Sequence, residues 1–247
     1  MGLNIFMVYI NCDMGESFGI YSTGDDEKIM PLIDIANVAC GFHASDPNHI
    51  DKTVGLAKKY NVKVGAHPSL PDLQGFGRRE MKMSSSDLTN TIIYQVGALK
   101  SFLDKHELKL NHIKPHGALY GMAYRDENVA RAIADAVAVF NVSIFGAANT
   151  THEKIYKYER GLNFVSEFYA DLDYDKNGNL LISKGKNEAY DSDLAAERSL
   201  RAYKENKVAN TGGTDTVVGC DTICVHSDTP NAVEIIKNIK NIFQEIK

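Results

Sequence analysis

The stretch IFMVYINCDMGE, residues 5–16, decides the fold class. An apolar run typical of a buried strand is followed by an amide, a thiol, two carboxylates and a glycine. Six further apolar runs follow it, at 34–40, 62–66, 112–114, 142–146, 163–168 and 222–226. Such runs, separated by helical segments, predict parallel βαβ units.

Amphipathic segments lie between most of these runs, and four have clear helical spacing: 46–60, 84–106, 126–140 and 231–246. Asp46 and Pro47 suit the N-cap and the first position of a helix. Seven strands alternating with helices fit either a closed β/α barrel or an open doubly wound sheet.

Residues 169–183 interrupt this alternation, and their KNGN turn predicts a β-hairpin. The acidic spacing from Asp173 to Gly178 also permits a calcium loop. Its twelfth position is Lys184, where calcium requires a glutamate, so we expect a plain turn.

Length and composition restrict the class of protein. The 247 residues suit a single domain, 1–247, and we find no internal repeat. A net charge of -5 argues against a nucleic-acid partner, and no run is long enough to span a membrane. No signal peptide is evident, so we expect a cytoplasmic protein with four reduced, buried thiols: Cys12, Cys40, Cys220 and Cys224.

Ionisable residues follow almost every predicted strand. In a parallel barrel these strand ends converge on one mouth, where catalytic residues of such folds lie, so the barrel is favoured over the open sheet. The residues that we expect to share this site are Asp13, Glu16, His43, His67, Lys114, His116, Glu167 and His226. Outside these positions, four histidines are expected to be structural: His49, His106, His112 and His152.

Six motifs in order carry a resemblance to a known family. They are NCDMGESFG (11–19), ANVACGFHASDP (36–47), GAHPSLPDLQGFGRREM (65–81), QVGAL (95–99), KPHGALYG (114–121) and ICVHSDTP (223–230). Through them the chain resembles the LamB/YcsF family of 5-oxoprolinase A subunits, essentially end to end. The resemblance implies an irregular, TIM-like barrel of seven strands, similar to the polysaccharide-deacetylase fold. It also implies ATP-dependent opening of the 5-oxoproline lactam to L-glutamate, together with subunits B and C.

The sequence lacks a G-x-x-x-x-G-K-[ST] phosphate loop, so we expect a partner subunit to handle the ATP. Asp13 is the predicted general base, while Lys114 and His116 would stabilise an oxyanion or phosphate. The remaining predicted catalytic residues, which would orient water or substrate, are His43, His67 and Glu167.

Substrate binding is predicted for a second group of residues: Asn11, Glu16, Arg78, Arg79 and His226. The two arginines offer a bidentate fork for a substrate carboxylate, although ordinary surface ion pairing explains them equally well. The chain departs from the family pattern at three positions. Ser45 and Ser227 stand where glycine is usual, and Leu172 stands where arginine is usual, which leaves a related lactam open as the substrate.

Two other functions remain open at this point. A metal-dependent amide or ester hydrolase acting alone would use Asp13 and two or three strand-end histidines as ligands, although the sequence has no H-x-x-x-H pair. We therefore assign no metal ligand. A non-catalytic subunit that carries substrate for its partners is the third possibility.

Overall fold

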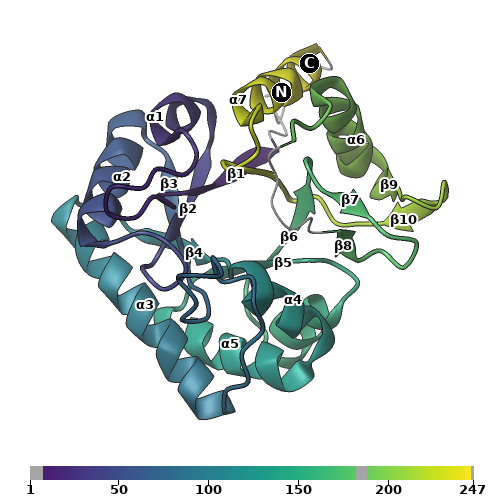
Figure 1. Cartoon of the computed structure of the whole chain (residues 1–247). Helices are drawn as coiled ribbons and strands as arrows, with labels where there is room; N and C mark the ends of the chain where they lie inside the picture. The colour runs from purple at the N-terminus through teal and green to yellow at the C-terminus, as the bar shows by residue number, and fades with distance from the viewer. Residues whose placement is uncertain (1–7, 182–187, 246–247) are drawn as a thin grey trace, which may run out of the picture.

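The computed structural model describes residues 8–181 and 188–245. Its centre is a closed barrel of seven parallel strands (Figure 1). These strands are β1 (Tyr9–Met14), β2 (Ile35–Ala39), β3 (Lys63–His67), β4 (Leu110–Ile113), β5 (Ser143–Gly146), β6 (Phe164–Tyr169) and β11 (Thr222–His226). The order around the barrel is β1-β11-β6-β5-β4-β3-β2, so the first and last barrel strands pair and close the sheet. The predicted seven-stranded β/α barrel is confirmed.

The first strand is longer on its C-terminal side than predicted. The apolar run 5–10 predicts a strand that ends before Asn11, but β1 continues to Met14. Residues 5–7 of that run lie outside the described residues. The strand includes Asn11 and Asp13 because both side chains face the barrel interior, where other polar groups bind them.

The four predicted helices are α2 (Pro47–Tyr60), α3 (Ser85–Lys105), α5 (Glu127–Phe140) and α7 (Ala232–Glu245). Position 246 of the last predicted segment lies outside the described residues. Asp46 caps α2 by accepting hydrogen bonds from the backbone N–H groups of Asn48 and His49. Not predicted are α1 (Asp26–Ile29), η1 (Met30–Leu32), α4 (Gly117–Arg125), η2 (Glu153–Glu159) and α6 (Ser192–Glu205). No helix in the described part of the chain is both long and apolar enough to cross a bilayer.

Two short hairpins extend from the barrel. β7 (Asp173–Tyr174) and β8 (Leu180–Leu181) form the predicted hairpin, and β9 (Lys207–Ala209) pairs with β10 (Asp215–Val217) in one that was not predicted. The Asp175 carboxylate accepts backbone hydrogen bonds within its own turn, as expected of a plain turn. Residues 182 and 183 of the predicted segment, and Lys184, lie outside the described residues.

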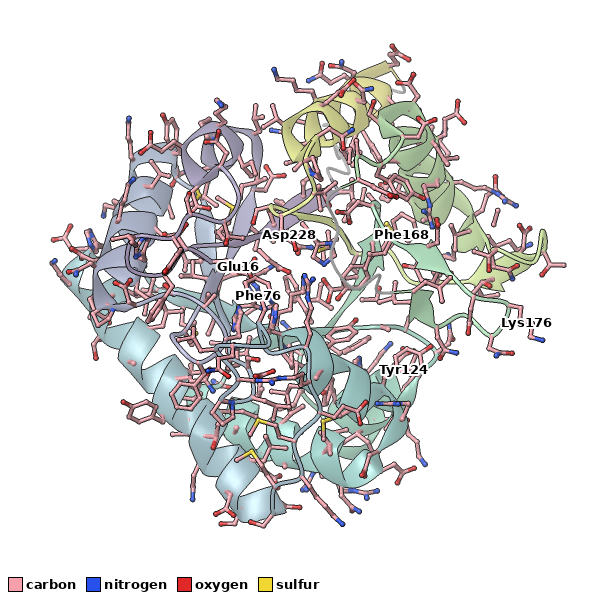
Figure 2. The ribbon with its side chains drawn as sticks, in the orientation of Figure 1. Glu16, Phe76, Tyr124, Phe168, Lys176 and Asp228 are labelled. Atoms are coloured by element: carbon pink, nitrogen blue, oxygen red, sulfur yellow. The ribbon has the colours of Figure 1, made fainter. Side chains whose placement is uncertain are left out.

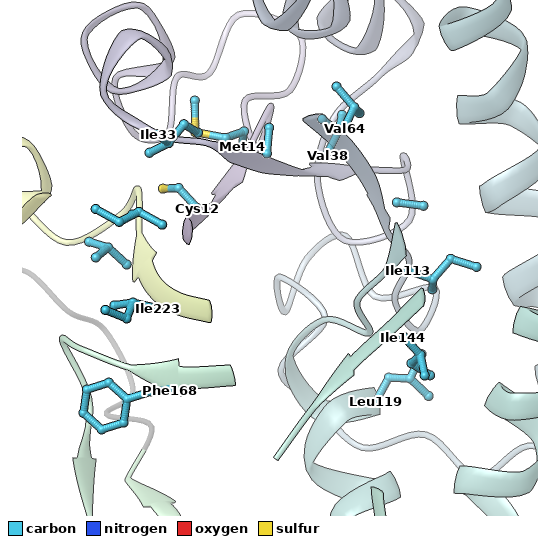
Figure 3. Close-up of a cluster of buried hydrophobic side chains, with 14 of the residues drawn as sticks. Cys12, Met14, Ile33, Val38, Val64, Ile113, Leu119, Ile144, Phe168 and Ile223 are labelled. Carbon is cyan, nitrogen blue, oxygen red and sulfur yellow. The ribbon is translucent and has the colours of Figure 1, made fainter. Parts of the chain in front are cut away.

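The two faces of the barrel strands differ in polarity, because alternate residues point to opposite sides. On the outer face, apolar side chains pack beneath the helices (Figure 3), among them Met14, Val38, Val64, Ile113, Ile144, Phe168 and Ile223. Burial of each contributes roughly 1.5–3 kcal/mol. All four cysteines are buried and free, as predicted. Polar side chains such as Asp13, Asn37 and Lys114 point to the inner face instead. The barrel interior therefore contains the groups that could bind or react with a ligand.

Candidate active site

The predicted site residues meet at the carboxyl ends of the barrel strands. Eight of them come together there: Asp13, Glu16, His43, His67, Lys114, His116, Glu167 and His226. In Figure 2, Glu16, Phe76 and Asp228 lie around the centre of the barrel, whereas Lys176 lies at the outer edge. The convergence expected from the sequence is present, and the chemical roles of the residues stay predictions.

Asp13 lies at the centre of the site. Its Oδ1 accepts hydrogen bonds from Lys114 Nζ at 2.9 Å and from Asn37 Nδ2 at 2.7 Å. Its Oδ2 lies 3.3 Å from His67 Nε2. Burial alone would raise the pKa of Asp13, but the interactions with His67 and Lys114 outweigh it and hold that pKa well below its usual value. So weak a base suits electrostatic stabilisation better than the predicted proton abstraction.

Lys114 is a buried ammonium between two carboxylates. Besides Asp13, its Nζ lies 3.2 Å from Glu167 Oε2 and 3.1 Å from Cys224 Sγ, and the Glu167 contact is an ion pair without hydrogen-bond alignment. Burial would lower the pKa of Lys114, but Asp13, Cys224 and Glu167 together raise it well above its usual value. Lys114 therefore stays charged at neutral pH, as a role in binding an oxyanion or phosphate requires.

A second layer of polar residues below Asp13 fixes its position. Asn37 Nδ2 also donates to Asn11 Oδ1 at 2.8 Å, and Asn11 donates to Thr222 Oγ1 at 3.0 Å. His112 Nε2 lies 2.7 Å from Asn37 Oδ1, with its ring in the space above Gly65, where an added Cβ would lie 2.0 Å from Cε1 of that ring. Asn11, predicted to bind substrate, therefore supports the site from below instead.

Three imidazoles and one carboxylate form a cluster beside Asp13. His116 Nδ1 lies 2.9 Å from His67 Nε2 and 3.6 Å from Glu16 Oε1, and His43 Nε2 lies 3.1 Å from the same oxygen. The rings of His43 and His116 stack with their centroids 3.7 Å apart. Burial, with the neighbouring histidines, lowers the pKa values of His43 and His116 well below their usual value, so both imidazoles are neutral.

His226 is oriented by a carboxylate that was not predicted to matter. Its Nδ1 lies 2.9 Å from Asp171 Oδ1, and the Thr229 hydroxyl donates to Asp171 Oδ2 at 2.6 Å. The other ring nitrogen, Nε2, lies 3.8 Å from Asp13 Oδ2. Burial would lower the pKa of His226, but Asp171 outweighs it and raises that pKa. A carboxylate that holds an imidazole with its second nitrogen toward a cavity is the arrangement of a general base.

The two arginines that were predicted to bind substrate lie in different surroundings. Arg78 lines the cavity and pairs with Asp228 at 2.8 Å. Arg79 pairs with Asp72 and leaves 64% of its side chain exposed, away from the residues that line the cavity. The prediction that Arg79 binds substrate is therefore not supported by its position, because Asp72 anchors its guanidinium in the loop.

Two neighbouring cavities open at this mouth. The first, about 50 Å³, is lined by Asp13, His67, Lys114, His116 and His226 among others. The second, about 230 Å³, is lined by Glu167 and shares Tyr169 and Leu180 with the first. Pockets for small ligands usually measure about 300–1,000 Å³. The cavity that Asp13 lines is therefore smaller than a usual ligand pocket.

Comparisons with known proteins agree with this architecture. The model of the LamB/YcsF family matches residues 8–247. The chain belongs to the LamB/YcsF family. The A subunit of 5-oxoprolinase from Staphylococcus aureus is 46% identical over 96% of each chain. A lactam utilization protein lamB from Emericella nidulans is also 46% identical, over 96% of this chain and 94% of the relative. The crystal structure of the lactam utilization protein from Thermus thermophilus is 40% identical and has a TM-score of 0.88, over 98% of this chain and 97% of that one.

The structure shows the surroundings of the three residues at which this LamB/YcsF protein departs from the expected family pattern. Ser45 has a φ of 74°, a conformation that favours glycine, and its buried hydroxyl has no hydrogen-bond partner in the described residues. Leu172 lines the 50 Å³ cavity and packs against Tyr120 and Tyr169. Ser227 is buried, and its Oγ would lie 2.8 Å from a Cβ added at Gly24. Only Leu172 is placed to contact a substrate directly.

The four histidines expected to be structural bind protein groups. His49 and His106 pair with Asp46 and Asp51 on the helices, and His152 bonds to the Tyr120 carbonyl. The side chains at the candidate site that the sequence did not single out are Asn37, Tyr169, Asp171 and Asp228. Asp171 and Asp228 lie in the polar segments EFYAD (167–171) and VHSDTP (225–230), which follow predicted strands. Their positions at strand ends could therefore have indicated a place in the site. Asn37 lies inside an apolar run, and nothing there marks it as functional.

Proposed function

We propose that this chain is the lactam-opening A subunit of a cytoplasmic, ATP-dependent 5-oxoprolinase that works with subunits B and C. The observation that carries the proposal is the buried Lys114 ammonium between Asp13 and Glu167 at a cavity wall. It is supported by two relatives, each 46% identical, whose names are those of a lactam utilization protein and of the A subunit of 5-oxoprolinase.

The reaction breaks the lactam C–N bond of 5-oxoproline. Water supplies a hydroxyl group to the carbonyl carbon and a proton to the nitrogen, while ATP is hydrolysed to ADP and phosphate. A lactam carbonyl is a poor electrophile, and transfer of the γ-phosphate of ATP to its oxygen activates the carbonyl carbon toward water. The water adduct then expels the ring nitrogen, which takes a proton, and a second water releases phosphate from the resulting acyl phosphate to leave the carboxylate. We assign the ATP-dependent step to a partner subunit, because the sequence lacks a phosphate loop of the G-x-x-x-x-G-K-[ST] type.

Within this chain, Lys114 would stabilise the negative charge that develops on the carbonyl oxygen or its phosphate. His226, held by Asp171, would take the proton from the attacking water. Arg78 would bind the substrate carboxylate in exchange for Asp228. Asp13 would keep Lys114 in position through its Oδ1.

The test is glutamate release from 5-oxoproline and ATP, with this chain and subunits B and C mixed and with each omitted in turn. We expect glutamate only from the full set. The Asp13→Asn variant removes the negative charge that holds Lys114, and it should reduce turnover about 10²-fold or more while the protein stays folded. A folded full set that forms no glutamate would rule out 5-oxoproline as substrate, and a fully active Asp13→Asn variant would favour the non-catalytic carrier.

A second candidate function is a metal-dependent hydrolase of small lactams or amides that needs no partner. The specific observation in its favour is that Glu16, His67 and His116 offer ligand atoms within 4.8 Å of one another. Hydrolysis by this chain alone, without ATP and with a divalent ion, would support it.

A further inference from the structure

Backbone carbonyls fix the tautomers of two histidines in the site. His67 Nδ1 lies 2.7 Å from the carbonyl oxygen of Lys114, and His116 Nε2 lies 2.8 Å from that of Phe76. A carbonyl oxygen only accepts hydrogen bonds, so both of these nitrogens carry the proton. When each ring carries a single proton, His67 Nε2 and His116 Nδ1 are therefore the nitrogens that present lone pairs.

These two lone pairs point at each other. His67 Nε2 and His116 Nδ1 lie 2.9 Å apart, Glu16 Oε1 lies 3.6 Å from His116 Nδ1, and Asp13 Oδ2 lies 3.3 Å from His67 Nε2. All four side chains are at most 5% exposed. Electron-rich atoms this close in a buried site repel one another unless a positive charge lies between them.

We propose that Glu16, His67 and His116 form a binding site for one divalent transition-metal ion of the zinc class. Two imidazoles and one carboxylate are the protein ligands of a catalytic zinc site, in which the fourth position stays open. Nitrogen ligands of a tetrahedral zinc ion lie roughly 3.3 Å apart, so the two rings need to separate by only a few tenths of an ångström.

The surrounding groups match what metal ligands require. Ligating histidines almost always donate their second N–H to a carbonyl or carboxylate, as His67 and His116 do here. The Glu16 carboxylate is in turn bound by His43 Nε2. We do not assign His43 as a metal ligand, because its ring stacks parallel to that of His116 and its Nε2 is directed at Glu16. Gly77 packs against the ring of His116 and the Cβ of His43, since an added Cβ at position 77 would lie 2.8 Å from His116 Cδ2 and from His43 Cβ.

This ligand set differs from the one that the sequence suggested. The metal-dependent alternative considered from the sequence would have used Asp13 as a ligand, but Asp13 Oδ1 is already bound by Lys114 and Asn37. A softer set, Asp13 with Cys224 and His226, also lies close together, but Lys114 Nζ contacts both Asp13 and Cys224 and would repel a cation. An ion can reach the proposed site through the cavity that His67 and His116 line.

The test is metal binding by the purified full chain, after removal of metal with a chelator and addition of Zn²⁺ or Co²⁺. We expect one ion per chain by elemental analysis after desalting, and a higher melting temperature with Zn²⁺. The Co²⁺ spectrum should show nitrogen and oxygen ligands and no thiolate band. Glu16→Gln and His116→Asn should each weaken binding by at least about 100-fold, and His43→Asn by about 10–100-fold.

His49→Gln is the matched control, because His49 also pairs with a carboxylate but lies on α2 outside the cluster. It should bind the ion as wild type does. Failure of the wild-type chain to retain Zn²⁺ or Co²⁺ would overturn the proposal and indicate that one proton bridges His67 and His116. A thiolate band would also overturn it, because it would place the ion at Cys224. Metal binding is measured without catalysis, so this result is separate from that of the glutamate assay.

Discussion

The two mouths of the barrel differ in both volume and chemistry. A cavity of about 680 Å³ lies at the amino ends of β3 to β6, and its described lining contains asparagines, aliphatic residues and two lysines, but no histidine or acid. The two cavities at the carboxyl ends measure about 50 and 230 Å³, yet the lining of the smaller one contains Asp13, Lys114 and three histidines. Converging ionisable groups, rather than empty volume, therefore identify the functional end of this barrel.

Residues other than glycine with positive φ values occur near both mouths, including Glu107 near the amino mouth and Asn149 near the carboxyl mouth. At the amino mouth, Asn61, Asn141 and Asn206 have positive φ values as C-caps of helices, a conformation that asparagine tolerates. At the carboxyl mouth, Ser45 and Phe76 have φ values of 74° and 53°, which neither residue favours. Strained residues persist where the surrounding structure holds them for function, as Phe76 is held with its carbonyl toward His116.

The largest expected difference between the mouths comes from one lysine at each. Lys114→Met leaves Asp13 and Glu167 buried without their cation, so we expect about a 10³-fold loss of turnover and roughly 3–5 kcal/mol lower stability. Lys63→Met at the amino mouth should change turnover by less than about twofold, because Lys63 is exposed beside Tyr9. Glutamate release and urea unfolding measure both effects. Equal losses in the two variants would contradict the assignment of the carboxyl mouth.

Leu172 tests how the carboxyl mouth selects its substrate. Leu172→Arg restores the residue expected at this position and adds a cation to the cavity wall. If the substrate is a lactam with a carboxylate, the KM for 5-oxoproline should fall about tenfold with little change in kcat, since one added charged contact contributes about 1.4 kcal/mol or more. Leu172→Met is the control for size. A rise in KM would indicate that this chain prefers a less acidic lactam.

His226 and Asp171 predict a pH dependence of stability at the carboxyl mouth. The folded-state pKa of His226 is raised above its ordinary value of 6.5, because Asp171 outweighs the opposing effect of burial. The stabilisation is therefore complete below the unfolded pKa and is lost as pH rises through the folded pKa. The melting temperature of wild type should exceed that of Asp171→Asn most at about pH 5.5 and less at about pH 8.5. A difference that grows with pH would contradict the raised pKa of His226.

The smallest expected effect is the relief of strain at Ser45. Ser45→Gly removes a buried hydroxyl that has no hydrogen-bond partner in the described residues. Glycine also adopts the φ of 74° at this position without strain. We expect about 1 kcal/mol of added stability, or roughly 2–4 °C in melting temperature. Asn61→Gly, at the amino mouth, is the control and should change stability by a few tenths of a kcal/mol, because asparagine already tolerates the conformation. A destabilised Ser45→Gly variant would show that the hydroxyl has a role.

The sequence predicted the fold more completely than the site. Seven apolar runs indicated seven strands, because short runs rich in β-branched residues between helical segments are typical of buried parallel strands. The predicted end of β1 was wrong because a polar barrel interior cannot be recognised from one strand: Asn11 and Asp13 look like loop residues until Asn37 and Lys114 are beside them. The position of Arg79 could not be predicted for a related reason. Its ion pair with Asp72 forms only in the folded loop, and the sequence does not reveal that loop conformation.

Gly65 and His112 constrain how this barrel can evolve. A methyl group at position 65 would overlap the imidazole at 112, and loss of that imidazole would leave Asn37 Oδ1 without its contact. Neither residue can therefore change alone without affecting the carboxylate at 13, which Asn37 also binds. Mutations on β2, β3 and β4 are thus expected to be epistatic: Gly65→Ala should be tolerated only in a background that already has a smaller residue at 112 and a new partner for Asn37.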